Sequence, residues 1–182
     1  MSIQYEHVTH PFGPVFDTDS EILILGSLPS VKSREQEFYY GHPQNRFWKV
    51  LAAIYREPVP QTKEEKRAFL LRSHVALWDV IASCDIAGSS DSSIRNVVPN
   101  DLRVILERAA IRKICLNGGK AYELFRKYCE IPEIMHPACG IVRLPSTSPA
   151  NAAWSLERLT GEWREGLLRN SLPEQQGHVP II

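Results

Sequence analysis

Short apolar runs that alternate with helical patterns constrain this chain more than any other feature of its sequence. The segment Glu21 to Gly26 (EILILG) is rich in Ile and Leu, and His74 to Ile81 (HVALWDVI) is rich in branched residues. Arg112 to Leu116 and Ile141 to Leu144 are shorter runs of the same kind. Each run has the length and composition of a buried strand, and turn residues follow the first and the last of them. The sequence therefore predicts strands at these positions.

Helical patterns fill the segments between these runs. Asn45 to Tyr55 carries apolar residues near helical spacing, and Thr62 to Ser73 opens with Thr62 and Glu65, a capping-box signature. A further helix is predicted from Asn100, which would cap it, to Ala110, and another from Gly119 to Tyr128. The last predicted helix runs from Ala150 to Arg169, and its apolar side carries Trp154, Leu156, Leu159, Trp163 and Leu167. Strands alternating with helices predict an α/β fold, with a mostly parallel sheet sandwiched between helices.

The length and composition of the chain suit a single compact domain. Its 182 residues are 43% hydrophobic, which supplies enough apolar surface for a sizeable core. We expect one domain over residues 1–170 and a loose tail over 171–182, which is rich in Pro, Gly and Gln. No apolar run approaches the roughly 20 residues of a membrane helix, and the first ten residues lack a secretory pattern, so we expect a cytoplasmic protein.

The cysteines and histidines give no sign of a metal site or a cofactor. Cys84, Cys115, Cys129 and Cys139 are widely spaced and form no CxxC pair, which predicts four free core thiols. Scattered ligation of an iron–sulfur cluster is the alternative. The formal net charge is zero, so composition alone does not point to nucleic acid. A net charge of zero does not exclude a nucleic-acid partner, however, because a local cationic or amide-rich groove is enough to hold a short stretch of backbone.

Polar loops follow three of the predicted strands. They are Gly26 to Ser30 leading into Tyr39 to Trp48 (YYGHPQNRFW), then Trp78 and Asp79, then Leu144 to Asn151 (LPSTSPAN). Loops at the carboxyl ends of parallel strands meet at one edge of the sheet, where ligands bind in such folds. The aromatic residues of the first loop could belong to the core, but they follow neither strand nor helix periodicity. Their mixture with Gly, His, Pro, Asn and Arg favours a binding loop.

In this order, the GSLPS loop, the YYGHPQNRFWK segment and the LPSTSPANA segment resemble the uracil-DNA glycosylase superfamily. The resemblance extends from about His10 to about Trp163 and is greatest to the hypoxanthine-DNA (deoxyinosine) glycosylase family, while HP-x-NRFWK also resembles the mismatch-specific glycosylases. It implies a three-layer α/β/α sandwich with a central four-stranded, mostly parallel sheet. It also implies a monofunctional enzyme that extrudes a deaminated base and cuts its bond to deoxyribose.

The resemblance assigns a catalytic role to Asn45, which would position the attacking water, although Asn45 could instead cap the helix predicted to follow it. Relatives carry Asp or Asn at the position of Leu28, and leucine cannot hold a water molecule. Tyr40 matches the aromatic residue on which the flipped base stacks. Alternatively, Tyr40 is a core or surface tyrosine with no role in stacking.

Base recognition is assigned to the ends of the first two strands. Asp79 stands where uracil-processing relatives have Asn, and a carboxylate would accept the ring N–H of hypoxanthine, unless it bonds a nearby loop amide or an Arg. Leu144 replaces a base-contacting His of uracil-specific relatives, so the backbone amides near Gly26 and Ser27 would steady the departing base. We expect contacts with DNA from Ser30, His42, Pro145, Ser146, Ser148 and Asn151, with Asn151 capping the last helix as the alternative for that residue.

The expected activity is therefore the excision of hypoxanthine from damaged DNA by a monomer that needs no metal or cofactor. No lysine lies within the matched motifs, so strand-cleaving lyase activity is not expected. Excision of uracil or xanthine on the same fold, including from single strands, is one alternative. A non-catalytic reader of damaged DNA is another, because Leu28 and Leu144 replace polar groups. An unrelated enzyme that binds a nucleotide at the same sheet edge is the third.

Overall fold

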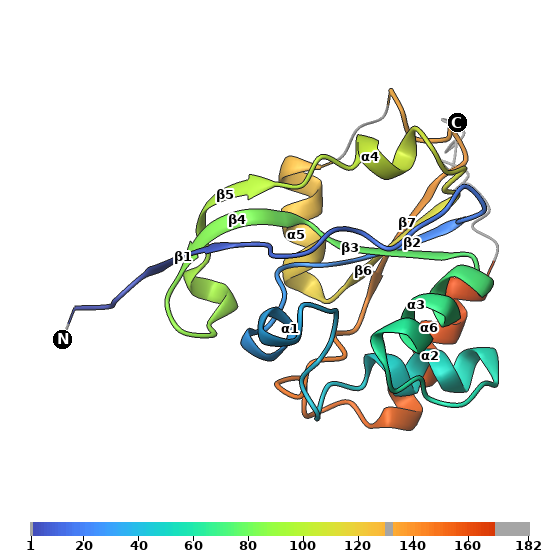
Figure 1. Cartoon of the computed structure of the whole chain (residues 1–182), viewed down its shortest axis with the longest axis horizontal. Helices are drawn as coiled ribbons and strands as arrows, with labels where there is room; N and C mark the ends of the chain where they lie inside the picture. Colours follow the sequence, from blue (N-terminus) through green and yellow to red (C-terminus); the bar gives the residue numbers. More distant parts are fainter. Residues whose placement is uncertain (1, 130–132, 170–182) are drawn as a thin grey trace, which may run out of the picture.

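A four-stranded parallel sheet forms the centre of the molecule (Figure 1). The computed structural model describes residues 2–129 and 133–169, so the predicted tail at 171–182 lies outside the described residues. The sheet has the order β3-β2-β6-β7, with β2 at Ile22–Gly26, β3 at Val75–Asp79, β6 at Lys113–Asn117 and β7 at Gly140–Leu144. Buried Ile, Leu and Val side chains fill β2, β3 and β6, as expected of parallel strands covered on both faces. The predicted parallel sheet is confirmed.

Helices cover both sides of this sheet. In Figure 1, α2 (Phe47–Tyr55), α3 (Lys63–Arg72) and α6 (Leu156–Leu168) group on one side, and α5 (Gly119–Tyr128) lies on the other. The capping box before α3 is present, because the Thr62 hydroxyl accepts the Glu65 N–H and the Glu65 carboxylate accepts the Thr62 N–H. The predicted three-layer α/β/α arrangement is therefore confirmed.

A second, antiparallel sheet continues from the end of β3 and was not predicted. It has the order β1-β4-β5, with β1 at Glu6–Thr9, β4 at Ile81–Ile86 and β5 at Arg95–Pro99. The run from His74 to Ile81 was interpreted as one strand, but the chain leaves the parallel sheet after Asp79 and enters β4 at Ile81. Both segments are apolar, so composition alone does not mark the change of sheet. The expected loop at 87–93 follows β4 and contains one 3₁₀ turn, η1 (Asp91–Ser93).

Two predicted helices have other bounds in the structure, and one helix was not predicted. The helix predicted from Asn100 to Ala110 is only α4 (Arg103–Leu106), since the Asn100 amide donates to the carbonyls of Asp79 and Ile81 instead of capping it. Ser155 caps α6, so the prediction that this helix starts near Ala150 was wrong, as was the alternative role of Asn151 as its cap. A short helix, α1 (Val31–Gln36), was not predicted at all.

The core packs on both faces of the parallel sheet. Leu159, Trp163 and Leu167 of α6 are buried as predicted, whereas Leu156 is exposed because it is the first residue of the helix. Three of the four cysteines are buried and Cys139 is half-buried. Within residues 2–129 and 133–169, no helix is long and apolar enough to cross a membrane. Over the same residues, no group of three or more His, Cys, Asp or Glu side chains could hold a metal ion.

Candidate active site

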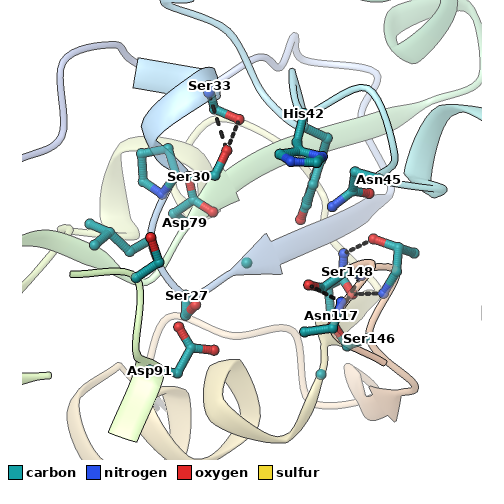
Figure 2. A pocket seen from close by; sticks show the side chains of 18 of the residues that line it. Ser27, Ser30, Ser33, His42, Asn45, Asp79, Asp91, Asn117, Ser146 and Ser148 are labelled. Atoms are coloured by element: carbon teal, nitrogen blue, oxygen red, sulfur yellow. Dashed lines mark hydrogen bonds between the residues drawn. The ribbon is translucent and has the colours of Figure 1, made fainter. Parts of the chain in front are cut away.

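The carboxyl ends of β2, β3 and β6 open into a cavity of about 590 Å³. Figure 2 shows side chains around it that come from segments far apart in the sequence, among them Ser30, Asp79 and Ser146. The predicted site residues that line this cavity are Gly26, Ser27, Ser30, Tyr40, His42, Asn45, Asp79, Ser146 and Ser148. Pro145 and Asn151 line a neighbouring pocket of about 560 Å³, which shares Ser146 and Ser148 with the first. The fold thus brings the predicted residues together, with two of them displaced to an adjoining hollow.

Gly26 lies on the floor of the cavity, at the end of β2 and directly beside Asp79 of β3. A Cβ atom at this position would collide with Asp79 Oδ1 and lie 3.0 Å from the Tyr40 hydroxyl oxygen. Glycine is therefore required here by the close approach of two polar side chains from other elements. The three residues form one compact group although they come from separate parts of the sequence.

Asp79 is held by a histidine that the sequence did not point to. His10 Nε2 lies 2.7 Å from Asp79 Oδ2, and the two side chains are only 3% and 4% exposed. The Phe12 N–H donates to His10 Nδ1 at 3.4 Å, so Nε2 carries the proton and donates to Asp79. Sequence reasoning considered a loop amide or an arginine as the alternative partner of Asp79. The observed partner follows β1, and 69 residues separate the pair, so no local signal could have found it.

Tyr40 has a strained backbone and a buried hydroxyl. Its φ of 52° is left-handed, a conformation that non-glycine residues adopt at a cost. The ring stacks on Phe47 with centroids 3.9 Å apart and planes inclined by 20°, so one of its faces is covered. Burial, then the Asp79 charge, raise the pKa of Tyr40 far above its ordinary value, and the Asn117 side chain opposes this rise only in part. The phenol is therefore neutral.

Asn45 lines the cavity just before α2 (Figure 2). Its Oδ1 accepts the N–H of Phe47, the first residue of α2, at 2.9 Å. The helix begins at Phe47 and not at Arg46 as predicted, but the expected bond between Asn45 and the start of the helix is present. This bond fixes the direction of the amide while leaving one lone pair of Oδ1 for a water molecule. The two roles considered for Asn45 are therefore compatible.

Arg46 ties the segment that contains Asn45 to the loop after β7, which spans residues 145–151 and is called the serine-rich loop below. Its guanidinium donates to the carbonyls of Ser148 at 2.8 Å, of Asn151 at 3.0 Å and of Trp154. Its backbone N–H donates to the Thr147 carbonyl at 3.1 Å. The planar fork of arginine suits such a set of carbonyl acceptors, and it holds the serine-rich loop beside Asn45. Sequence reasoning assigned no role to Arg46.

Asn117, at the end of β6, is a further residue that sequence reasoning missed. Its Oδ1 accepts the Thr147 N–H at 3.1 Å and its Nδ2 donates to the Thr147 hydroxyl at 3.0 Å, so both ends of the amide are used. Thr147 is fully buried. The signal was available, because Asn-Gly-Gly follows the third predicted strand just as polar loops follow the others. Asn117 thus holds the serine-rich loop through Thr147, while Arg46 holds it through the carbonyls of Ser148 and Asn151.

The residues expected to contact DNA also make local hydrogen bonds. Ser30 caps α1 through Oγ, which accepts the Ser33 N–H at 3.2 Å. The Ser146 hydroxyl oxygen accepts the Ser148 N–H, and the Ser148 hydroxyl oxygen accepts the Ala150 N–H. Ser30 Oγ also lies 3.0 Å from Ser33 Oγ, in a hydrogen bond that either hydroxyl could donate. The Ser146 and Ser148 hydroxyl oxygens act as acceptors, which leaves their protons available for a phosphate oxygen. Contact with DNA at these residues, at His42 and in the adjoining pocket stays a prediction.

Charged groups of both signs line the cavity. Its cations are Lys32, Arg34 and Lys120, and its carboxylates are Asp79 and Asp91. Arg34 lies 3.7 Å from the Glu6 carboxylate. Lys32 pairs with Glu35 at 3.0 Å and Lys120 with Glu123 at 3.4 Å. Asp91 lies at the border of both hollows, and burial raises its pKa against the opposing charge of Lys120. The three cations of the cavity, called the cationic rim below, suit a nucleic-acid backbone.

Fold and site together define an α/β enzyme that binds its ligand at the carboxyl edge of a parallel sheet. The chain belongs to the uracil DNA glycosylase superfamily, whose family model matches residues 14–168. It is 36% identical to a hypoxanthine DNA glycosylase of Methanosarcina acetivorans over 154 residues, which cover 84% of this chain and 93% of that one.

Two further comparisons agree with this assignment. A hypoxanthine DNA glycosylase of Methanosarcina barkeri is 37% identical over 110 residues, covering 60% of this chain and 70% of the relative. The fold is also similar to the NMR structure of a Methanosarcina acetivorans protein described as a uracil DNA glycosylase, with a TM-score of 0.69 at 36% identity. That match covers 84% of this chain and 92% of the other. The protein is thus a DNA glycosylase by family.

Proposed function

We propose that this glycosylase excises deaminated bases from DNA in base excision repair, with hypoxanthine as its main substrate. The observation that carries the proposal is the convergence on one cavity of Tyr40 and Asn45, from the loop before α2, with Asp79, from the end of β3. Each supplies a group that base excision needs: an amide to place water, an aromatic ring and an acceptor for a ring N–H. The names of the relatives support hypoxanthine as the base.

The size of the cavity fits a single extruded nucleoside. Its volume of about 590 Å³ lies within the range of small-molecule sites, roughly 300 to 1,000 Å³. A base inside a duplex cannot reach such a cavity, so the target nucleotide must leave the stack. The cationic rim and the serine-rich loop would hold the flanking phosphates. The partner is therefore damaged DNA, and we expect a monomer that acts in the cytoplasm, on the nucleoid.

Hydrolysis in this site would depend on the position of the attacking water more than on a strong general base. Cleavage of an N-glycosidic bond passes through an oxocarbenium-like state, as in other glycoside hydrolysis, and a weakly activated water can capture that state. The remaining lone pair of Asn45 Oδ1 would hold this water in line with the sugar. The departing base takes both electrons of the broken bond, and the backbone amides near Gly26 and Ser27 would stabilise its charge. The water forms the new bond to the sugar carbon and loses one proton to solvent, and the base anion takes up one proton from solvent.

The proposed enzyme is monofunctional. A lyase forms an imine between a neutral lysine and the abasic sugar. Lys32 and Lys120 reach the cavity, but each pairs with a glutamate on its own helix. Neither lies within the GSLPS, YYGHPQNRFWK or LPSTSPANA segments. The expected product is therefore an intact strand with an abasic site.

The proposal is tested by single-turnover excision from short duplexes that carry hypoxanthine, uracil or xanthine, with hot alkali to reveal abasic sites. Faster release of hypoxanthine than of uracil or xanthine supports the proposal. Faster release of uracil or xanthine would support glycosylase activity but contradict the proposed preference for hypoxanthine. Binding of damaged duplex without release of any base would instead identify a non-catalytic reader. The same reactions on single strands show whether a duplex is needed.

A further inference from the structure

The Tyr40 hydroxyl is a buried polar group without a hydrogen bond of normal geometry to any described residue. Burying an unpaired hydroxyl lowers the stability of a folded protein, so such groups in a binding cavity usually have a ligand as partner. Two of the nearby polar groups are engaged elsewhere, because Asp79 Oδ2 accepts from His10 and both ends of the Asn117 amide are bonded to Thr147. Asp79 Oδ1 faces the same space as the hydroxyl but makes no hydrogen bond with it. The hydroxyl therefore remains available inside the cavity that Tyr40 lines.

The Tyr40 hydroxyl and Asp79 Oδ1 converge on the same small space above Gly26. An atom added to the Gly26 Cα would meet both of them. The two groups differ in hydrogen-bonding character, because a neutral phenol can donate and a carboxylate can only accept. The floor of the cavity thus presents one donor beside one acceptor.

We propose that this donor–acceptor pair recognises the carbonyl and the adjacent ring N–H that deamination creates in a base. In hypoxanthine, the Tyr40 hydroxyl would donate to O6 and Asp79 Oδ1 would accept from N1–H. This inference rests on the proposed function. Adenine has the opposite pattern, an amino donor beside an unprotonated ring nitrogen, so donor would face donor and acceptor would face acceptor. Buried polar groups left unpaired in this way reject the wrong base strongly.

The same pair would accept uracil and reject cytosine, because uracil also places a carbonyl beside a ring N–H. Guanine and thymine share the carbonyl and the N–H, but guanine carries an additional amino group and thymine a methyl group, so other contacts must exclude them. The pair therefore separates each deaminated base from its parent, hypoxanthine from adenine and uracil from cytosine.

His10 is a positioning residue in this scheme. Its bond to Asp79 Oδ2 at 2.7 Å, in a pair almost free of solvent, fixes the carboxylate so that Oδ1 lies over Gly26. A neutral His10 that donates from Nε2 leaves the negative charge on Asp79, which keeps the carboxylate a pure acceptor. The strained backbone of Tyr40 and its stack on Phe47 set the hydroxyl in the same way.

This role differs from stacking of the base on the Tyr40 ring. A hydroxyl lies in the plane of its ring, so a base bonded to it edge to edge does not lie on the ring face at the same time. Tyr40→Phe keeps the ring and removes only the hydroxyl. Stacking predicts that this substitution has no effect on base release, whereas the donor role predicts a clear loss.

The test is single-turnover release of hypoxanthine and of uracil by the wild-type protein, Tyr40→Phe and Tyr55→Phe. Tyr55 lies on α2, does not line the cavity and packs against Phe69, so its variant makes the same chemical change elsewhere. We expect Tyr40→Phe to lose roughly tenfold or more in rate on both bases, and Tyr55→Phe to keep the wild-type rate. The melting temperature of Tyr40→Phe should stay equal or rise, because an unpaired buried hydroxyl is removed. An unchanged rate in Tyr40→Phe would overturn the inference.

A measurement of DNA affinity tests this inference independently of whether the protein excises a base. The equilibrium affinities of wild type and Tyr40→Phe are measured by fluorescence anisotropy on duplexes that differ only by hypoxanthine or adenine at one position. A wild-type preference for hypoxanthine that disappears in Tyr40→Phe supports the pair even if no base is released. If wild type and Tyr40→Phe prefer hypoxanthine over adenine to the same extent, the donor–acceptor pair is contradicted even if excision proceeds.

Discussion

Replacing Asn45 by alanine separates the structural and the catalytic roles of this side chain. The substitution removes the bond from Asn45 Oδ1 to the Phe47 N–H at the start of α2. Loss of such a bond at a helix start typically costs ~1 kcal/mol, and for a protein of this size that lowers the melting temperature by about 2 to 4 °C. Typical total stabilities are about 5 to 15 kcal/mol, so the variant remains almost fully folded at 25 °C.

Catalysis should suffer far more than stability. Loss of a preorganised polar group in an active site lowers the rate by roughly 100-fold or more, equivalent to ~2.7 kcal/mol of transition-state stabilisation. Asn45→Ser is the matched control for folding, because serine can still cap α2 but its shorter side chain does not reach as far into the cavity. The assay is single-turnover release of hypoxanthine with enzyme in excess, beside thermal unfolding of each variant.

We expect Asn45→Ser to melt near the wild-type temperature and to release base nearly as slowly as Asn45→Ala. Affinity for the damaged duplex should change little in both variants, because the amide acts on water. Wild-type rates in Asn45→Ala would refute the assignment of the water to Asn45. A rate that recovers in Asn45→Ser would show that the helix start, and not the water, depends on this residue.

Four further perturbations test the rest of the site. Gly26→Ala would press a methyl group against Asp79 Oδ1 and the Tyr40 hydroxyl, so urea unfolding should show a loss of about 1 to 3 kcal/mol together with slow base release, and a fully stable, active variant would disprove the close packing. Arg46→Met would leave the carbonyls of the serine-rich loop without their donor, at a cost of ~3 kcal/mol in the free energy of unfolding; denaturation indistinguishable from wild type would argue against the clamp. Asp79→Asn should slow the release of hypoxanthine and of uracil alike, because an amide whose oxygen accepts from His10 turns its NH2 group, a donor, toward the ring N–H of either base; wild-type rates on both bases would remove Asp79 from base readout. Borohydride should trap no covalent complex with abasic DNA, because Lys32 and Lys120 are paired, whereas a trapped band lost in either Lys→Met variant would reveal a lyase.

The central sheet and most of its helices could be predicted because their signals are local. Glu21 to Gly26 and Arg112 to Leu116 are apolar enough to be strands covered on both faces, and they became β2 and β6. The capping box at Thr62 is complete within four residues, and the observed cap follows it. The antiparallel sheet was missed because β4 follows β3 after a single residue, without a turn signal between them.

The convergence of Gly26, Asn45 and Asp79 could also be predicted, because the carboxyl ends of parallel strands share one edge. The contacts that hold these residues could not. His10 and Asp79 are 69 residues apart, and Arg46 reaches carbonyls more than 100 residues further along the chain. A histidine before a proline or an arginine before a helix has many ordinary roles, and nothing in its neighbourhood names the partner.

The sequence by itself determined which segments are strands, which loops carry polar chemistry and which family the chain resembles, since hydrophobic periodicity and motif order are properties of neighbouring residues. Only the tertiary structure decided which oxygen of Asp79 is free, that the Tyr40 hydroxyl is buried without a partner, and that Arg46 and Asn117 hold the serine-rich loop. The physical reason is that a hydrogen bond depends on distances of about 3 Å between groups remote in sequence, and these distances exist only once the core has packed.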